Sequence, residues 1–154
     1  MAKKISELPA ADPLTGDELV EVSQGTPLAS KKVTVSTLRG ASAEASDFTG
    51  FYPGKPAASA IVMRVPVGRA FTFPANMESS KGLAVSGATA STTFSLKKNG
   101  TQFCTMVFAA GAATATFTAS PATSFAAGDI LEISAPATQD STLADVGFYL
   151  KGDR

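Results

Sequence analysis

The side chains that most often perform acid–base and nucleophilic chemistry are scarce in this chain of 154 residues. It contains no histidine, which is the commonest general base, the usual partner of a catalytic serine and the commonest zinc ligand. Cys104 is its only cysteine, so an intrachain disulfide and a cysteine-based zinc cluster are excluded. Cys104 falls in an alternating pattern at 102–108, where we expect a small, buried, apolar residue.

Carboxylates gather only near the N-terminus, where Asp17, Glu18 and Glu21 are close in sequence. Glu18 and Glu21 fall on opposite faces of a predicted strand, which favours a solvated or interface role over paired-carboxylate catalysis. Residues 12–18 lack the alternating acids and distal glutamate of a calcium loop, and residues 82–87 lack the Lys-Ser/Thr pair of a phosphate loop. Ser–Lys and paired-carboxylate mechanisms stay open in principle. We expect a non-enzymatic protein without catalytic residues, cofactor or metal.

The charge balance argues against a nucleic-acid partner. The chain carries 13 Lys and Arg against 13 Asp and Glu, which gives a formal net charge of zero. A nucleic-acid binder needs a basic excess to displace counterions from phosphates. The basic doublets at 3–4, 31–32 and 97–98 are therefore interpreted as solvated termini, strand ends or turns.

Neither a targeting segment nor a membrane span is expected. The N-terminus, Met-Ala-Lys-Lys-Ile-Ser, lacks the apolar core of a signal peptide. No apolar run approaches the ~20 residues that cross a bilayer as a helix. We expect the chain to stay in the cytoplasm in which it is made.

Residues 1–40 form an arm that is too small and too thinly apolar to fold by itself. Two short strands are predicted, at 18–23 and 31–35, joined by a loop that opens with Gln-Gly-Thr-Pro at 24–27. In the first strand, Leu19, Glu21 and Ser23 share one face, and Val20 and Val22 share the other. A lone two-stranded hairpin is marginal in water, and the arm has no aromatic residue. It must therefore dock on something.

The rest of the chain is predicted to be β-structure. Small and polar residues at 41–56, with three aromatics among turn residues near the end, suit a linker and the start of a larger domain. Asn99-Gly100 between two alternating runs is the strongest local signal for a β-hairpin. The predicted strands are 60–67, 69–73, 83–86, 92–98, 101–108, 112–119, 130–135 and 143–151.

The alternation within these strands predicts which side chains face the core. We expect three inward sets: Phe71 with Phe73, Phe94 with Leu96, and Val146 with Phe148 and Leu150. Thr93, Ser95 and Lys97 are expected to face outward. In the run at 112–119, Ala113, Ala115, Phe117 and Ala119 share one face, small enough for close approach of a second sheet or a neighbouring subunit.

The predicted fold class is all-β. An N-terminal extended arm with a short β-hairpin, at 1–40, precedes a linker at 41–56. An antiparallel, jelly-roll-like β-sandwich of about eight strands follows at 57–154. The length permits one sizeable domain plus an arm.

Both halves resemble proteins of tailed bacteriophages. The arm is similar to the I-S-x-L-P-A-A-x-x-L-T-G-x-E-L-V-x-V-x-Q-G…K-x-V-T-V-x-x-L pattern that opens many virion fibre and decoration proteins. The matching residues are Ile5, Ser6, Leu8, Pro9, Ala10, Ala11, Leu14, Thr15, Gly16, Glu18, Leu19, Val20, Val22, Gln24, Gly25, Val33, Thr34, Val35 and Leu38, with Lys31 or Lys32 as the lysine. The remainder resembles, less specifically, a C-terminal module of phage fibre-like proteins, at 54–60, 94–102, 124–129, 135–138 and 143–146.

This resemblance implies a structural protein of a phage particle, made in the host cytoplasm and located in the virion. It implies that the arm attaches the protein to capsid or tail proteins, and that the sandwich projects as a homotrimer, as a capsid decoration, head fibre or short tail fibre. The implied anchoring residues are Ile5, Leu8, Pro9, Leu14, Gly16, Leu19, Val20, Val22, Gln24, Val33, Val35 and Leu38.

Two other functions stay open. The first is a receptor-binding tail module that recognises a glycan or protein on the host surface. Glycan sites usually present exposed aromatic platforms, especially tryptophan, and this chain has no tryptophan and two tyrosines. The second is a bacterial β-sandwich unrelated to phage, which leaves the arm unexplained.

Overall fold

The computed structural model describes residues 19–24, 29–34, 45–119 and 121–154. The chain divides into two compact units, Met1–Ala43 and Glu44–Arg154. In the first unit, β1 (Leu19–Gln24) and β2 (Ala29–Thr34) form an antiparallel pair whose register places Val20 opposite Val33 and Glu21 opposite Lys32. A two-stranded ladder of this length needs further packing to be stable in water.

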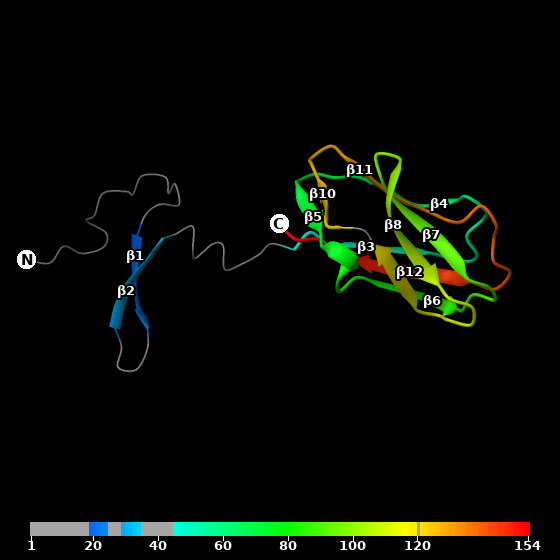
Figure 1. Cartoon of the computed structure of the whole chain (residues 1–154), viewed down its shortest axis with the longest axis horizontal. Coiled ribbons are helices and arrows are strands. Elements are labelled where there is room, and N and C mark those ends of the chain that lie inside the picture. The colour runs from blue at the N-terminus through cyan, green and yellow to red at the C-terminus, as the bar shows by residue number, and fades with distance from the viewer. Residues whose placement is uncertain (1–18, 25–28, 35–44, 120) are drawn as a thin grey trace, which may run out of the picture. The chain divides into compact units, whose positions relative to one another are not determined.

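The second unit is built almost entirely of short antiparallel strands (Figure 1). Beside one 3-10 turn, η2 (Ala75–Met77), its described residues form ten strands. These are β3 (Phe48–Tyr52), β4 (Ile61–Pro66), β5 (Phe71–Phe73), β6 (Lys81–Ser86), β7 (Thr92–Lys98), β8 (Thr101–Phe108), β9 (Ala115–Ala119), β10 (Thr123–Phe125), β11 (Ile130–Ser134) and β12 (Ala144–Leu150).

Two larger sheets enclose the core of this unit. One has five strands in the order β4-β11-β7-β8-β9, and the other has three in the order β3-β12-β6. A β-bridge between Leu83 and Thr114 links the two sheets beside β6 and β9, supported by a hydrogen bond from Ala84 N–H to the Ala113 carbonyl at 2.8 Å. A small ladder of β5 and β10 stands at one end of the domain.

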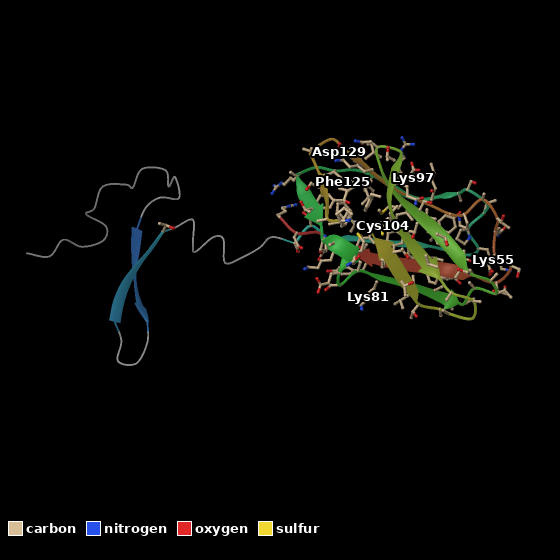
Figure 2. All side chains as sticks on the ribbon, in the orientation of Figure 1. Lys55, Lys81, Lys97, Cys104, Phe125 and Asp129 are labelled. Carbon is tan, nitrogen blue, oxygen red and sulfur yellow. The ribbon has the colours of Figure 1, made fainter. Side chains whose placement is uncertain are left out.

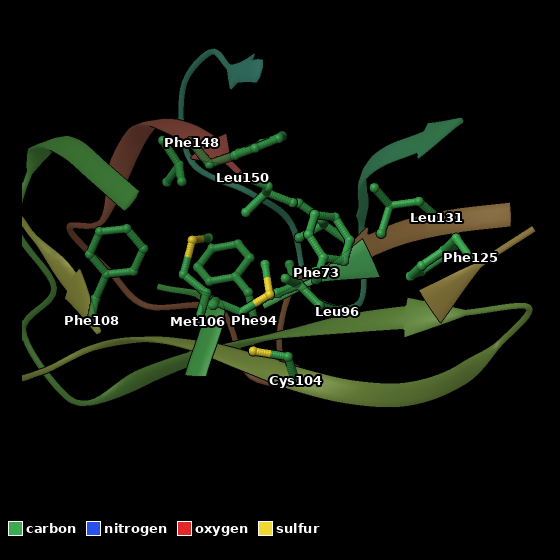
Figure 3. Close-up of a cluster of buried hydrophobic side chains, with 14 of the residues drawn as sticks. Phe73, Phe94, Leu96, Cys104, Met106, Phe108, Phe125, Leu131, Phe148 and Leu150 are labelled. Atoms are coloured by element: carbon green, nitrogen blue, oxygen red, sulfur yellow. The ribbon is translucent and has the colours of Figure 1, made fainter. Parts of the chain in front are cut away.

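The inner faces of the two sheets meet in one hydrophobic core (Figure 3). The alternation of apolar residues along the strands explains its composition, because successive side chains point to opposite faces of a sheet. The largest fully buried side chains are Phe73, Phe94, Phe108, Leu96, Met106, Leu131, Ile133, Leu143, Leu150 and Val146. The inward positions predicted for residues 71, 73, 94, 96, 146, 148 and 150 are confirmed.

The hairpin predicted at Asn99-Gly100 is confirmed. Both residues have positive φ, 49° and 83°, as a tight turn of the I′ class requires. The ladder between β7 and β8 shifts register after Leu96, so that Phe103 is an extra residue on β8. The Phe103 ring stacks on Phe73 with centroids 5.7 Å apart, within a cluster of five phenylalanines at this end of the domain.

Two aspartates hold the loops at opposite ends of the domain. Asp129 accepts hydrogen bonds from Ala126 N–H at 2.8 Å and Asn99 Nδ2 at 2.7 Å, and its carboxylate lies 3.0 Å from Lys98 Nζ. Figure 2 shows Asp129 beside Phe125, with Lys55 at the far end of the same domain. The backbone amide of Ala126 is the main reason that the pKa of Asp129 falls to about 2.

Asp140 plays the corresponding role at the other end. Its carboxylate accepts backbone hydrogen bonds from Thr89, Ala90, Thr142 and Leu143 at 2.8–3.2 Å. These amides, that of Leu143 first, hold the pKa of Asp140 well below its ordinary value. One side chain therefore joins two loops about fifty positions apart in sequence.

The all-β, antiparallel fold class is confirmed, while the jelly-roll connectivity stays a prediction. Phe48–Tyr52, assigned to the linker from sequence, instead forms strand β3, which pairs with β12. Thr123–Phe125 forms a strand that the sequence analysis missed. The strand expected at 112–119 begins at Ala115, because residues 113 and 114 turn aside to contact β6.

Candidate functional site on the outer face of the three-stranded sheet

The outer face of the sheet β3-β12-β6 carries large apolar side chains that face solvent. Phe51 is 63% exposed, Leu83 57% and Val85 77%. Together they form what we call the outer apolar patch. Ile61 on β4, at 50%, is the other large apolar residue exposed to this degree in the part of the chain that the structure describes. Contiguous exposed apolar residues on a folded domain mark an interaction surface more often than scattered ones do.

Strand register brings the patch together. Gly147 on β12 is paired with Phe51 on one side and with Leu83 on the other, so the three residues form one row across the sheet. Val85 lies two residues beyond Leu83 on the same face of β6. Residues 32 to 96 positions apart in sequence thus form one surface.

Tight packing on the inner face explains why these large residues point outward. A Cβ built on Gly50 would lie 2.6 Å from Phe148 Cε2, and one built on Gly82 would lie 2.7 Å from Met106 Sδ and 2.8 Å from Ala115 Cβ. A side chain at either inward position would therefore force its neighbours to shift. Because neighbours alternate, Phe51 and Leu83 must face solvent.

A groove lies beside the patch. Its volume is about 280 Å³, and it is lined by Gly50, Lys81, Leu83, Gly147, Phe148 and Tyr149. Gly147 supplies no side chain here, and a Cβ on it would lie 3.9 Å from Phe51 Cδ2, so the Phe51 ring stands next to the groove. The groove is smaller than the roughly 300–1,000 Å³ typical of small-molecule pockets, and it suits a single large side chain.

Polar and charged groups occupy the other end of this face. Tyr149 Oη donates to Asp47 Oδ2 at 2.9 Å, and this hydrogen bond raises the pKa of Tyr149. Lys151 Nζ lies 3.1 Å from Asp153 Oδ1, and that contact raises the pKa of Lys151. Lys81, at the end of the groove nearest to Tyr149, is exposed (Figure 2). The face therefore joins an apolar half to a half that carries both signs of charge.

Two other clefts are more polar. One, of about 380 Å³, is lined by Ser46, Asp47, Arg69, Phe71 and Arg154 among others. The other, of about 320 Å³, is lined mainly by hydroxyl residues near Asp140. The carboxylate of Asp140 already accepts hydrogen bonds from the backbone amides of its own loop. We therefore interpret this cleft as part of the loop structure and not as a binding site.

Cys104 lies in the core, as expected from the sequence. It is 3% exposed, and burial raises the pKa of its thiol to about 11. Across residues 45–119 and 121–154 and the two arm strands, no group of three or more His, Cys, Asp and Glu is placed to hold a metal ion. No helix in these ranges has the length and apolarity needed to cross a bilayer.

The predicted anchoring residues fall partly outside the described ranges. Leu19, Val20, Val22 and Gln24 lie on β1, and Val33 lies on β2. The ladder brings Val20 opposite Val33 and Leu19 opposite Thr34. The others, Ile5, Leu8, Pro9, Leu14, Gly16, Val35 and Leu38, lie outside the described residues. The anchoring assignment stays a prediction.

The outer apolar patch was missed from sequence, although one signal was available. Phe48 and Phe51 are three apart, so a strand through both must place them on opposite faces. Assigning this segment to a linker concealed that conflict. On β6 the larger residues, Leu83 and Val85, alternate with the smaller residues, Gly82 and Ala84. The sequence does not say which of the two sets faces the core.

Comparison of the chain with known protein families, curated proteins and solved structures finds no match in any of the three.

Proposed function

We propose that this chain is a non-enzymatic structural protein of a bacteriophage particle. In this proposal the N-terminal arm anchors it to capsid or tail proteins. The β-sandwich, with jelly-roll connectivity, projects as a homotrimer, as a capsid decoration, head fibre or short tail fibre. The mature location would be the virion.

The arm carries the proposal. It is a compact unit separate from the sandwich, and its described part is one antiparallel ladder of six-residue strands. A two-stranded ladder of this length is marginal in water by itself, so the proposal requires a docking surface, which we assign to another virion protein. The resemblance of this segment to phage anchoring arms favours a capsid or tail protein as the docking partner.

A receptor-binding role is the second candidate. The observation that favours it is an exposed aromatic ring, Phe51, on the same face as the hydrogen-bonded pair of Tyr149 and Asp47. Aromatic rings with a neighbouring acid are typical of glycan sites. Leu83 and Val85 beside Phe51 are aliphatic, however, and favour a protein surface as the partner.

Deletion of residues 1–43 tests the anchor directly. We expect the truncated protein to remain folded, since residues 44–154 have their own core, and to stay in the supernatant when phage particles lacking this protein are sedimented. The full chain should sediment with the particles, and so should residues 1–43 fused to an unrelated fluorescent protein. Truncated protein that reaches full occupancy on the particles would show that the arm is not the anchor.

Copy number per particle then separates the locations within this proposal. High copy number, set by the repeated capsid lattice, indicates a decoration or head fibre. Low copy number, set by the single tail, indicates a tail fibre.

A further inference from the structure

We infer that the outer face of the sheet β3-β12-β6 is the surface on which copies of this chain associate. In this arrangement, Phe51 of each copy enters the groove beside Gly147 of the next copy. The inference deepens the proposed function and rests on it for the trimeric state, because it names the surface through which the sandwich would self-associate.

Shape is the first argument. One face carries both a protruding ring and a groove that fits one large side chain: Phe51 is 63% exposed, and the neighbouring groove holds about 280 Å³. The ring lies beside its own groove rather than in it, since Phe51 does not line it. A projection and a recess on the same surface allow identical copies to interlock. The copies form a closed ring when the rotation that relates one copy to the next is a whole-number fraction of a full turn.

The position of the apolar residues is the second argument. Phe51 and Leu83 flank Gly147 across the sheet, and Val85 lies two residues beyond Leu83. The missing side chain of Gly147 lets another chain approach the sheet closely. Large aromatic and aliphatic residues at the centre of a patch with polar groups at its border form the usual anatomy of a protein interface. Ile61, the other large apolar residue exposed to this degree among the described residues, lies on the other sheet, apart from these three.

Charge is the third argument, and it favours a second copy over a strongly charged partner. Lys81 and Lys151 lie at the polar end of the face together with Asp47, Asp153 and Glu78. Since both signs are present, one copy of the face can meet another without repulsion. The chain also has no net charge that would keep copies apart at long range.

The composition of the face argues against a glycan. By strand alternation its outward positions are Thr49, Phe51, Lys81, Leu83, Val85, Asp145, Gly147 and Tyr149, none of which carries a side-chain amide. The carboxylate of Asp145 already accepts a hydrogen bond from Gly54 N–H at 2.8 Å. The aliphatic Leu83 and Val85 offer no hydrogen bonds to a sugar hydroxyl. They lose contact with water most effectively against another apolar protein surface.

Light scattering on the full chain tests this inference. Wild-type protein should show about three times the 15.6 kDa mass of the chain over a range of concentrations. Val85→Lys, at a side chain 77% exposed, should reduce the mass threefold to that of a monomer, without a change in circular dichroism. Gly147→Val should do the same by filling the groove, since a Cβ there has 3.9 Å of clearance within the chain.

Ile61→Lys is the matched control, because it places the same charge at an exposed apolar residue of the other sheet. It should leave the mass unchanged. The inference fails if wild-type protein is a monomer at every concentration, if both patch variants keep the wild-type mass, or if Ile61→Lys dissociates the protein as fully as Val85→Lys.

Sedimentation with particles separates this inference from the anchor. A monomeric Val85→Lys protein that still sediments through its arm supports both. An oligomeric wild type that does not sediment supports the face and contradicts the anchor. A wild-type monomer that binds host cells, and loses this binding on Val85→Lys, would assign the patch to a receptor and overturn self-association.

Discussion

The ring of Phe148 packs directly over Gly50, its register partner on the neighbouring strand. A Cβ on Gly50 would overlap Cζ of the ring and lie 2.6 Å from Cε2. Phe148 is 6% exposed, so the ring is part of the buried core. This contact fixes the inward face of β3 and, because neighbours alternate, the outward direction of Phe51.

Gly50→Ala should therefore destabilise the domain by about 1–3 kcal/mol, the usual cost of forcing extra volume into a packed core. Gly68→Ala is the control, since a Cβ there meets no atom within 4 Å; we expect its free energy of unfolding to stay within about 0.5 kcal/mol of wild type. Both are measured by thermal unfolding at one protein concentration. Equal stability of the two variants would contradict the packing of Phe148 on Gly50.

We expect a graded series of stability losses from three substitutions in the hairpin of β7 and β8. Gly100→Val should lose about 1–3 kcal/mol, because valine is strained at a φ of +83°. Phe94→Ala should lose about 3–5 kcal/mol through the cavity left by a fully buried ring. Lys97→Ala should lose less than about 1 kcal/mol, since its ion pair with Glu132 is partly exposed.

Denaturant unfolding of these three variants tests the register as well as the fold. After loss of Lys97, Arg64 still lies 3.8 Å from Glu132, which limits the effect. A Lys97→Ala protein as unstable as Phe94→Ala would reverse the assignment of inner and outer faces in β7.

Asp129 predicts a loss of stability in acid. Hydrogen bonds, first from Ala126 N–H, lower its pKa to about 2, below the value of about 3.9 in an unfolded chain. The ionised form therefore favours folding. That contribution is complete above about pH 4 and is lost as the pH falls towards 2. Asp140, whose pKa is also lowered, adds in the same direction.

Asp129→Asn should show a lower melting temperature than wild type at pH 7 and a shallower fall between pH 4 and 2. The measurement is thermal unfolding followed across that range for both proteins. Parallel curves would mean that Asp129 does not contribute to the acid sensitivity.

We expect the thiol of Cys104 to react only when the protein unfolds. It is 3% exposed and its pKa is about 11, so it is protonated and shielded at neutral pH. Because it is the chain's only cysteine, alkylation reports on this site alone. Labelling should be slow in buffer and fast in concentrated denaturant. Rapid labelling of the native protein, at the rate of a small-molecule thiol, would place Cys104 outside the core.

The sequence by itself determined the all-β class, the tight turn at Asn99-Gly100 and the alternation of most strands. These features depend on residues adjacent along the chain: positive φ favours Asn and Gly, and a two-residue period reports one buried face. The burial of Cys104 followed from the same alternation. The antiparallel pair of β1 and β2 was predicted from two short strands on either side of a turn-rich loop, while the docking of the arm stays a prediction.

The tertiary structure alone decided which side of β3 and β6 faces the core, and hence where the outer apolar patch lies. Local alternation leaves that choice open, since Phe51 and Leu83 alternate with small residues that are equally able to face inward. The choice is made by volume that distant residues occupy: Phe148 above Gly50, and Met106 with Ala115 above Gly82. Once folding has brought these side chains together, the interior has no room for Phe51 or Leu83, and both residues lie on the surface.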